Sequence, residues 1–154
     1  MTLYFAYGSN MNRTAMRQRC PGAGVVATAV LEGHRFVIIS DGYASVLPAS
    51  GGTVHGLLWR LDARSLAALN AYESLDAGLY RTVTLPVRAE GKLHAALVYL
   101  ARSRTPGLPR PGYLEEVIAA ARELNFPADY VETLARCAAP GLPARPARET
   151  GEIA

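Results

Sequence analysis

The chain contains one lysine, two cysteines and no long apolar run. Lys92 is the only lysine, so the formal net charge of +3 comes mainly from arginines spread along the 154 residues. Nucleic-acid binding requires a concentrated basic face with interleaved aromatic residues, and no stretch has that pattern. No apolar run approaches the roughly 18 residues that cross a bilayer, and no basic residue precedes Arg13. We therefore expect a cytoplasmic protein that binds neither nucleic acid nor membrane.

The cysteines and histidines form no recognisable metal or nucleophile motif. Cys20 and Cys137 lie near opposite ends of the chain without a CxxC pair, which indicates no metal site and leaves a disulfide open. Isolated histidines occur in strand-like sequence at His34, His55 and His94. The GxSxG, HExxH and GxxxxGK[ST] patterns are missing. A pair formed through space between Ser9 and one of these histidines stays an alternative.

Half of the residues are apolar and 19% are charged, which is typical of one globular domain. Runs rich in Val, Ala, Leu and Ile predict strands over residues 24–31, 34–40, 43–48, 53–61, 79–88 and 92–101. Glu32-Gly33 and Glu90-Gly91 predict the turns of two hairpins. Since strands and helices do not alternate strictly, we expect an α+β fold. It should be a mixed, mostly antiparallel sheet curled into a small barrel, flanked by about four helices.

Helix signals occur in four places. They predict helices over residues 12–20, 63–73, 113–124 and 127–137. Asn10 is the predicted N-cap of the first helix and Asp62 that of the second. The Pro-, Ala- and Arg-rich end predicts a domain over residues 1–137 and an extended or flexible tail over 138–154. With no obvious apolar surface stripe, a monomer or weak homodimer is expected.

The segment from Tyr4 to Asn10 reads as a short buried strand that ends in a polar loop, Tyr7-Gly8-Ser9-Asn10. A strand end, a tight Gly8-Ser9 turn and a helix start would bring several unpaired backbone N–H groups together. Such a place suits a carboxylate, a phosphate or a developing oxyanion. The alternative is that Gly8 only makes a turn and Asn10 only caps a helix.

Glu73 is predicted to face inward from the end of its helix. It lies four residues after Leu69 and seven after Leu66, so the three side chains share one face. Desolvation and the negative end of the helix dipole would both raise the pKa of Glu73. A carboxyl group that titrates near neutrality is suited to general acid–base catalysis. The alternative is a glutamate in a frayed last turn that reaches solvent or pairs with Arg81.

Taken together, the loop and the glutamate resemble the γ-glutamylcyclotransferase family. The segment Tyr4–Met11 is similar to the signature loop of that family, and Glu73 falls where the family carries its catalytic glutamate. The run Gly56-Leu57-Leu58-Trp59 resembles the strand that precedes the catalytic helix. Tyr99 and Tyr113 also stand at familiar positions. The combination is specific, although each motif by itself would be weak.

The resemblance covers about residues 3–137 and implies a small mixed α/β fold with a barrel-like sheet. It implies cyclisation of a γ-glutamyl amino acid or amine to 5-oxoproline, an acyltransferase- or lyase-type step that releases the free amine without metal or organic cofactor. Glu73 is the implied general acid/base. The implied substrate-binding residues are Tyr7, Gly8, Ser9, Asn10, Tyr99 and Tyr113.

The sequence also departs from the best-known members of that family. It is shorter, as expected of a bacterial-type single domain, and residues 41–52 carry no recognisable specificity signature. The identity of the leaving amine therefore stays open. The alternative from another class is a non-catalytic protein that binds a small anion or an amino-acid-like ligand on the same fold.

Overall fold

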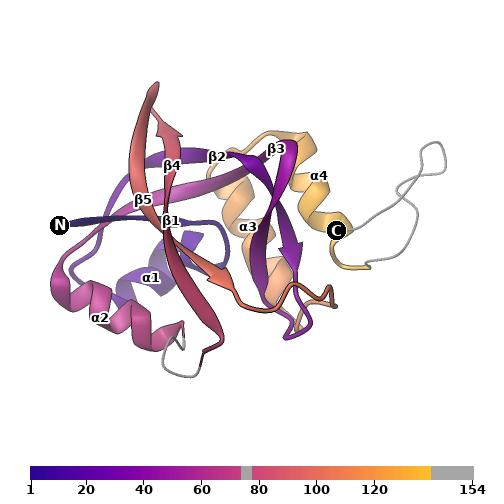
Figure 1. The fold of residues 1–154 in the computed structure, drawn as a ribbon, viewed down its shortest axis with the longest axis horizontal. Helices are drawn as coiled ribbons and strands as arrows, with labels where there is room; N and C mark the ends of the chain where they lie inside the picture. The colour runs from indigo at the N-terminus through magenta and orange to yellow at the C-terminus, as the bar shows by residue number, and fades with distance from the viewer. Residues whose placement is uncertain (74–77, 140–154) are drawn as a thin grey trace.

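The computed structural model describes residues 1–73 and 78–139, which form a closed barrel flanked by helices (Figure 1). The barrel order is β1-β3-β2-β4-β5. The strands are β1 Thr2–Ala6, β2 Gly24–Ile38, β3 Ala44–Leu61, β4 Tyr80–Ala89 and β5 Lys92–Ala101. Neighbours are antiparallel except β1 and β5, which close the barrel as a parallel pair. The predicted α+β fold with a mixed, mostly antiparallel barrel is confirmed.

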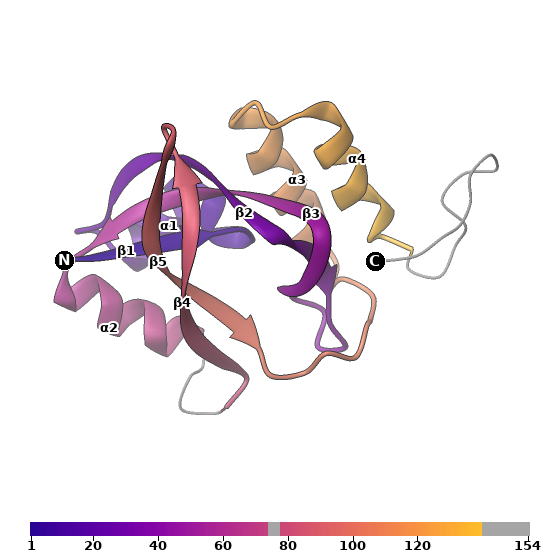
Figure 2. The same cartoon turned by 45° about the horizontal axis from the view of Figure 1, so that its top comes forward.

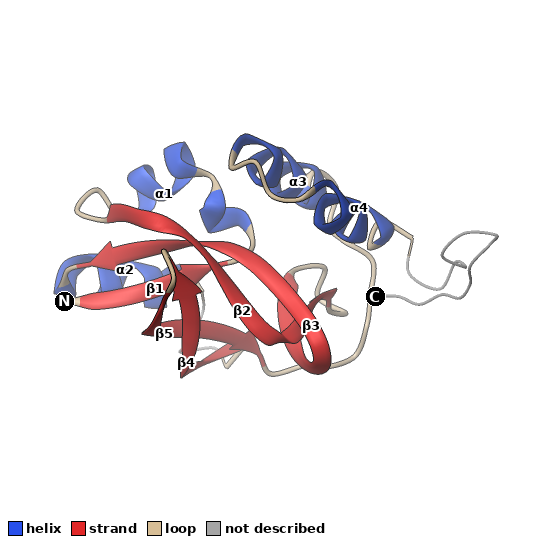
Figure 3. Ribbon diagram, turned by 90° about the horizontal axis from the view of Figure 1, so that it is seen from above, coloured by secondary structure: helices blue, strands red, loops and turns tan. Residues whose placement is uncertain are grey.

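Helices cover the barrel on one side and at one end. They are the 3-10 segment η1 Ser9–Met11 and the helices α1 Arg13–Arg19, α2 Ala63–Tyr72, α3 Tyr113–Glu123 and α4 Ala128–Arg136. Figure 3 shows α1, α3 and α4 along one side of the sheet, with the β4–β5 hairpin on the other. In Figure 2 the β2–β3 ribbon extends beyond the barrel towards α3 and α4. The described part of the chain thus contains the four predicted helices.

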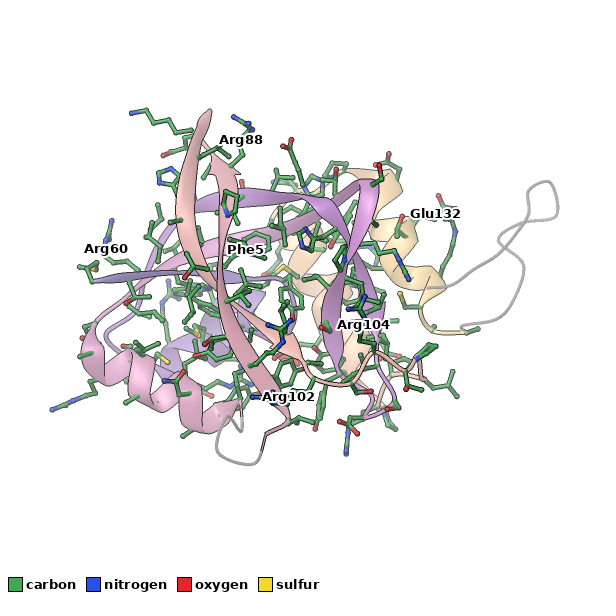
Figure 4. All side chains as sticks on the ribbon, viewed as in Figure 1. Phe5, Arg60, Arg88, Arg102, Arg104 and Glu132 are labelled. Atoms are coloured by element: carbon green, nitrogen blue, oxygen red, sulfur yellow. The ribbon has the colours of Figure 1, made fainter. Side chains whose placement is uncertain are left out.

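Large apolar side chains from facing strands fill the barrel. Phe5 and Trp59 are both 0% exposed, and Tyr4 in β1 is the register partner of Trp59 in β3. Figure 4 shows Phe5 at the centre, whereas Arg60, Arg88 and Arg102 lie at different edges of the molecule. These labelled arginines are therefore spread around the barrel, as their spacing in the sequence suggests.

The structure confirms one predicted hairpin and corrects the other. Glu90 and Gly91 have φ angles of 52° and 79°, which make the tight turn between β4 and β5. The predicted turn at Glu32-Gly33 is wrong, because β2 runs on through Ile38. Gly33 has a φ of 76°, and the β2–β3 register shifts between Glu32 and His34. The left-handed glycine therefore lies at an irregularity of the β2–β3 ladder, where β3 carries extra residues at 49–52, and the chain reverses only after Ile38.

The two predicted N-caps also differ in outcome. Asp62 caps α2, since its side chain accepts a hydrogen bond of 2.7 Å from the backbone N–H of Ser65. The N-cap of α1 is Asn12 rather than Asn10, because the Asn12 side chain accepts from the N–H of Ala15 at 3.0 Å. A 3-10 turn separates the loop from α1, and it leaves the Asn10 side chain available for other contacts.

None of the helices within residues 1–73 and 78–139 is long and apolar enough to span a membrane. The predicted tail over 138–154 falls almost wholly outside the described residues, which end at Ala139. The division into a domain and a tail therefore stays a prediction. Cys20 and Cys137 are both buried free thiols, so no disulfide joins them.

Gly56 is expected to be essential for the close approach of β1 and β3. A Cβ at this position would lie 2.4 Å from the Ala6 carbonyl oxygen and 2.7 Å from the Phe5 ring. Gly56→Ala should lower the free energy of unfolding by about 1–3 kcal/mol, measured by urea denaturation. In the matched Gly24→Ala control, the Cβ would meet only an arginine nitrogen at 3.7 Å, so the change should stay within about 0.5 kcal/mol. Equal effects of the two substitutions would contradict this steric explanation.

Candidate active site

A cavity of about 300 Å³ opens where the end of β1, the end of α2 and the start of α3 meet. Its described lining residues are Tyr4, Tyr7, Gly8, Ser9, Asn10, Tyr43, Ala44, Tyr72, Glu73, Leu79, Tyr80, Tyr99, Tyr113 and Glu116. All seven residues named from the sequence as catalytic or substrate-binding are among them. The fold therefore brings together residues that are up to 106 positions apart, from Tyr7 to Tyr113.

The loop is fixed from two directions. The Trp59 indole donates a hydrogen bond of 3.1 Å to the backbone carbonyl of Asn10. On the other side, a Cβ on Gly8 would lie 2.8 Å from the hydroxyl oxygen of Tyr113, so the backbone approaches this tyrosine closely. Ser9 and Asn10 form the first turn of η1, where backbone N–H groups have no partner within the helix.

Glu73 lies at the C-cap of α2, half-buried, with its carboxylate at the cavity. Its Oε2 accepts a hydrogen bond of 3.4 Å from the Asn10 side chain. Leu69, one turn earlier, is 0% exposed, as the predicted inward face requires, whereas Leu66 is only partly buried. The alternative of a glutamate in solvent beside the exposed Arg81 does not describe this structure.

Burial raises the pKa of Glu73 to about 7, and the nearby positive charge of Arg19 acts in the opposite direction. Removal of water from around a carboxylate disfavours its charged form, which explains the upward direction. The protonated and ionised forms are therefore both populated near neutral pH. This is the property expected of a group that accepts and returns a proton.

Seven of the eight tyrosines in the sequence line this cavity, and three of them use their hydroxyl proton within the protein. The Tyr7 hydroxyl donates to the backbone carbonyl of Tyr99, and the Tyr99 hydroxyl donates to Asn70. The Tyr80 hydroxyl donates to the Ala44 carbonyl at 2.8 Å. These three rings are therefore held in place, and their protons are not available to a bound ligand.

Tyr4 and Tyr113 have the opposite arrangement, since their hydroxyl oxygens accept hydrogen bonds. Tyr4 accepts from the Asn10 side chain at 3.0 Å, and Tyr113 accepts from the backbone N–H of Ala44 at 3.2 Å. Neither hydroxyl donates to an acceptor within residues 1–73 and 78–139. Burial raises the pKa of both groups, so both keep their protons at neutral pH. Tyr4 and Tyr113 are therefore neutral O–H donors at the cavity.

Several residues at the cavity or beside it were missed in the sequence-based prediction. Tyr4 stands inside the recognised loop motif, but its position in a strand indicated only a core residue. Arg19 donates to the Asn10 side-chain oxygen from the last turn of α1, a contact that no local spacing reveals. Glu116 accepts a hydrogen bond of 3.2 Å from Asn12. Acidic residues are common in the first turn of a helix, so the position of Glu116 at the start of α3 did not indicate a functional role.

The alternative of a Ser–His pair finds no support at this cavity. Ser9 lines it, but the described lining contains no histidine. His34 hydrogen-bonds the Glu32 carbonyl on the surface, and His55 packs against Phe126 and Tyr130. The ionisable side chains at the cavity are thus carboxylates and tyrosines.

The comparison with known proteins matches residues 4–116 to the family model described as gamma-glutamyl cyclotransferase, AIG2-like. The chain belongs to the γ-glutamylcyclotransferase family. The matched span contains the loop, Glu73, Tyr99 and Tyr113. The protein is therefore an enzyme of this family, as the resemblance of its two motifs implied.

Individual relatives agree with this assignment. The gamma-glutamylcyclotransferase of Mus musculus is 28% identical over 143 residues, which cover 86% of this chain and 76% of the mouse protein. The putative gamma-glutamylcyclotransferase YkqA of Bacillus subtilis is 29% identical over 144 residues, which cover 86% of this chain and 50% of YkqA. A solved gamma-glutamyl cyclotransferase has the same fold, with a TM-score of 0.82 and 24% identity over 99% of this chain and 93% of that chain.

The pKa of Glu73 makes the stability of this family member depend on pH. The pKa rises from about 4.3 in an unfolded chain to about 7 in the fold. The group's stabilising contribution is therefore complete below about pH 4 and is lost as the pH rises through about 7. Glu73→Gln stays neutral and avoids that loss. The variant should exceed the wild type by up to about 3 kcal/mol near pH 8.5.

Urea denaturation between about pH 4 and pH 8.5 measures this difference. The exposed Glu115 provides a matched control, and Glu115→Gln should lack the gain in stability expected of Glu73→Gln near pH 8.5. A wild-type curve that runs parallel to Glu73→Gln would show that the pKa of Glu73 is not raised by folding.

Proposed function

We propose that this protein converts a small γ-glutamyl amino acid or amine into 5-oxoproline and the free amine. The observation that carries the proposal is the half-buried Glu73, with a pKa of about 7, hydrogen-bonded to Asn10 at the same cavity as the loop. A proton-transferring group and an anion-binding loop are the two parts that this reaction needs. The mouse relative is named for this activity, which supports the same chemistry here.

The reaction requires no nucleophile from the protein. The substrate's α-amine attacks its own γ-carbonyl carbon, and closing a ring within one bound molecule contributes roughly 7–11 kcal/mol when the geometry is held. Glu73 takes a proton from the α-ammonium, which creates the attacking amine. The same carboxyl group then gives a proton to the departing nitrogen as the γ-amide bond breaks. A pKa near 7 favours both transfers.

The loop is proposed to bind the γ-glutamyl group. Backbone amides of Ser9 and Asn10 in the first turn of η1 are suited to the substrate carboxylate or carbonyl oxygen. Of the two tyrosines outside the loop that the resemblance implies, Tyr113 keeps an unused hydroxyl proton for the ligand. Tyr99 donates its proton to Asn70, so its contribution is a fixed wall of the cavity.

A non-catalytic binder of an amino-acid-like anion is the second candidate. Binding alone needs no group that titrates near neutrality inside the cavity, whereas proton transfer does. The position and raised pKa of Glu73 therefore favour catalysis over binding alone. The two candidates differ in what they predict for a neutral substitute at this position.

Glu73→Gln should abolish the release of 5-oxoproline from γ-glutamyl-alanine while substrate affinity stays within about tenfold. Glutamine keeps the shape of the side chain and loses the proton transfer, whose typical contribution to rate is about 10²–10⁴-fold. Chromatographic detection of 5-oxoproline measures turnover, and calorimetry measures affinity. Glu115→Gln is again the control and should turn over at the wild-type rate. Unchanged turnover in Glu73→Gln would remove Glu73 from the mechanism.

The pH dependence of kcat/KM should have an acid limb with an apparent pKa of about 7. The free enzyme must hold Glu73 ionised to accept the first proton, so kcat/KM should fall tenfold per pH unit below that value. Rates measured between about pH 5 and pH 9 test this expectation. A limb near pH 4, the ordinary range of a solvent-exposed glutamate, would contradict the role given to burial.

A further inference from the structure

The side-chain amide of Asn10 has one allowed orientation. Arg19 donates from Nη1 to the Asn10 side-chain oxygen. A guanidinium has only donors, so the atom of Asn10 that faces it must be Oδ1 and not Nδ2. Asn10 is 2% exposed, and the Trp59 indole donates a hydrogen bond to its backbone carbonyl. Arg19 therefore decides where the two amide hydrogens point.

Those two hydrogens connect a tyrosine and the glutamate. Asn10 Nδ2 donates to the Tyr4 hydroxyl oxygen at 3.0 Å and to Glu73 Oε2 at 3.4 Å. Because Tyr4 already accepts this bond, its own proton is directed elsewhere. Tyr4 lines the cavity and donates to no acceptor within the described residues. Burial keeps the hydroxyl protonated, so Tyr4 is a neutral donor next to Glu73.

Arg19 is itself held in place. It lies in the last turn of α1, and its guanidinium carbon stacks 4.0 Å from the ring centroid of Tyr72 at the end of α2. These two helices contact each other, and Figure 1 shows them next to one another at one end of the barrel. Tyr4 packs edge-on against Tyr99, with ring centroids 5.6 Å apart. The donor and the residue that orients it thus belong to rigid elements.

We propose that Tyr4 is a catalytic hydrogen-bond donor to the γ-carbonyl oxygen of the substrate, and that Arg19 is a positioning residue that aims Tyr4 and Glu73 through Asn10. The proposal rests on the proposed function. As the α-nitrogen bonds to the γ-carbon, the carbonyl π electrons move onto oxygen, and the Tyr4 O–H stabilises that negative charge without giving up its proton. When the carbonyl re-forms, the bond to the leaving nitrogen breaks and Glu73 protonates that nitrogen.

The pKa of Glu73 depends on the ionisable side chains that neighbouring helices and strands place around it. The titratable and charged groups of the described residues that surround it are Tyr4, Tyr7, Arg19, Tyr43, Tyr72, Tyr80, Tyr99, Tyr113 and Glu116. Among these, Arg19 is the cation. Loss of its charge should therefore raise the pKa at which Glu73 titrates, as well as release the Asn10 amide.

Tyr4→Phe tests the donor. The substitution removes one oxygen and keeps the ring, so kcat for γ-glutamyl-alanine should fall about 10²-fold with KM changed less than about threefold. The lactam oxygen of 5-oxoproline is the former γ-carbonyl oxygen, so calorimetry should show binding of this product weakened about threefold to tenfold. Tyr130→Phe is the matched control. Tyr130 is the one tyrosine that does not line the cavity, and its hydroxyl donates a hydrogen bond to the His55 carbonyl. Tyr130→Phe should therefore keep the wild-type kcat.

Arg19→Met and Arg19→Lys test the positioning role. Arg19→Met should lower kcat about tenfold and move the acid limb of kcat/KM upward by about one pH unit. Arg19→Lys restores the charge and should return the limb to its wild-type position. Arg17→Met, on the exposed face of the same helix, is the control and should change neither quantity. Carbon-13 NMR titration of the Glu73 carboxyl group should report the same upward shift without relying on turnover.

The outcomes separate this inference from the proposed function. If Glu73→Gln abolishes 5-oxoproline release but Tyr4→Phe retains wild-type kcat and product affinity, the donor role of Tyr4 is wrong and the function stands. If the Glu73 titration in Arg19→Met equals that of the wild type, the positioning role is wrong. If the wild type neither releases nor binds 5-oxoproline, the proposed function and this inference fall together.

Discussion

Asn10 is 2% exposed, so its side-chain amide must satisfy its oxygen and both hydrogens inside the protein. Its three partners come from different elements: Arg19 from α1, Tyr4 from β1 and Glu73 from the C-cap of α2. Trp59 in β3 holds the backbone of the same residue. The barrel and two helices therefore meet at one polar side chain, and the geometry of the cavity depends on it.

The remaining wall of the cavity is fixed by packing rather than by charge. Tyr43 packs edge-on against Tyr113 with centroids 5.3 Å apart, and Tyr4 packs in the same manner against Tyr99. Aromatic rings held by neighbours and by hydrogen bonds have few conformations to lose when a ligand binds. A cavity of this kind is organised before the substrate arrives, which is the condition for electrostatic stabilisation of a transition state.

Local patterns in the sequence predicted the inward face of the helix that ends at Glu73, but they did not decide between alternative cap and turn residues. The spacing of Glu73 from Leu69 correctly placed the carboxylate inward, because a helix repeats every 3.6 residues. The choice of cap was wrong since Asn10 and Asn12 are equally good cap residues, and only burial of Asn10 decides between them. Gly33 was assigned to a turn because a left-handed glycine serves turns and bulges alike.

The features of the candidate site that the sequence did not predict depend on contacts between residues far apart in the chain. The stacking of Arg19 on Tyr72 joins the ends of two helices separated by 53 positions in the chain, and no motif encodes such a distance. No motif shows, either, which tyrosine hydroxyls can donate a proton to a ligand, because this depends on the backbone group that each hydroxyl meets in the fold. These details require the assembled barrel, whereas the family and the inward position of Glu73 could be predicted from the sequence.

Because burial keeps the tyrosine hydroxyls neutral, the titration of Glu73 controls how the charge of the cavity changes near neutral pH. In the proposed reaction, a γ-glutamyl substrate enters with an α-ammonium group, which the ionised Glu73 would attract. In 5-oxoproline that nitrogen is a neutral lactam, and only the carboxylate charge of the product is left. The proposed chemical step would therefore replace attraction by repulsion at the same carboxyl group, and this repulsion would favour departure of the product.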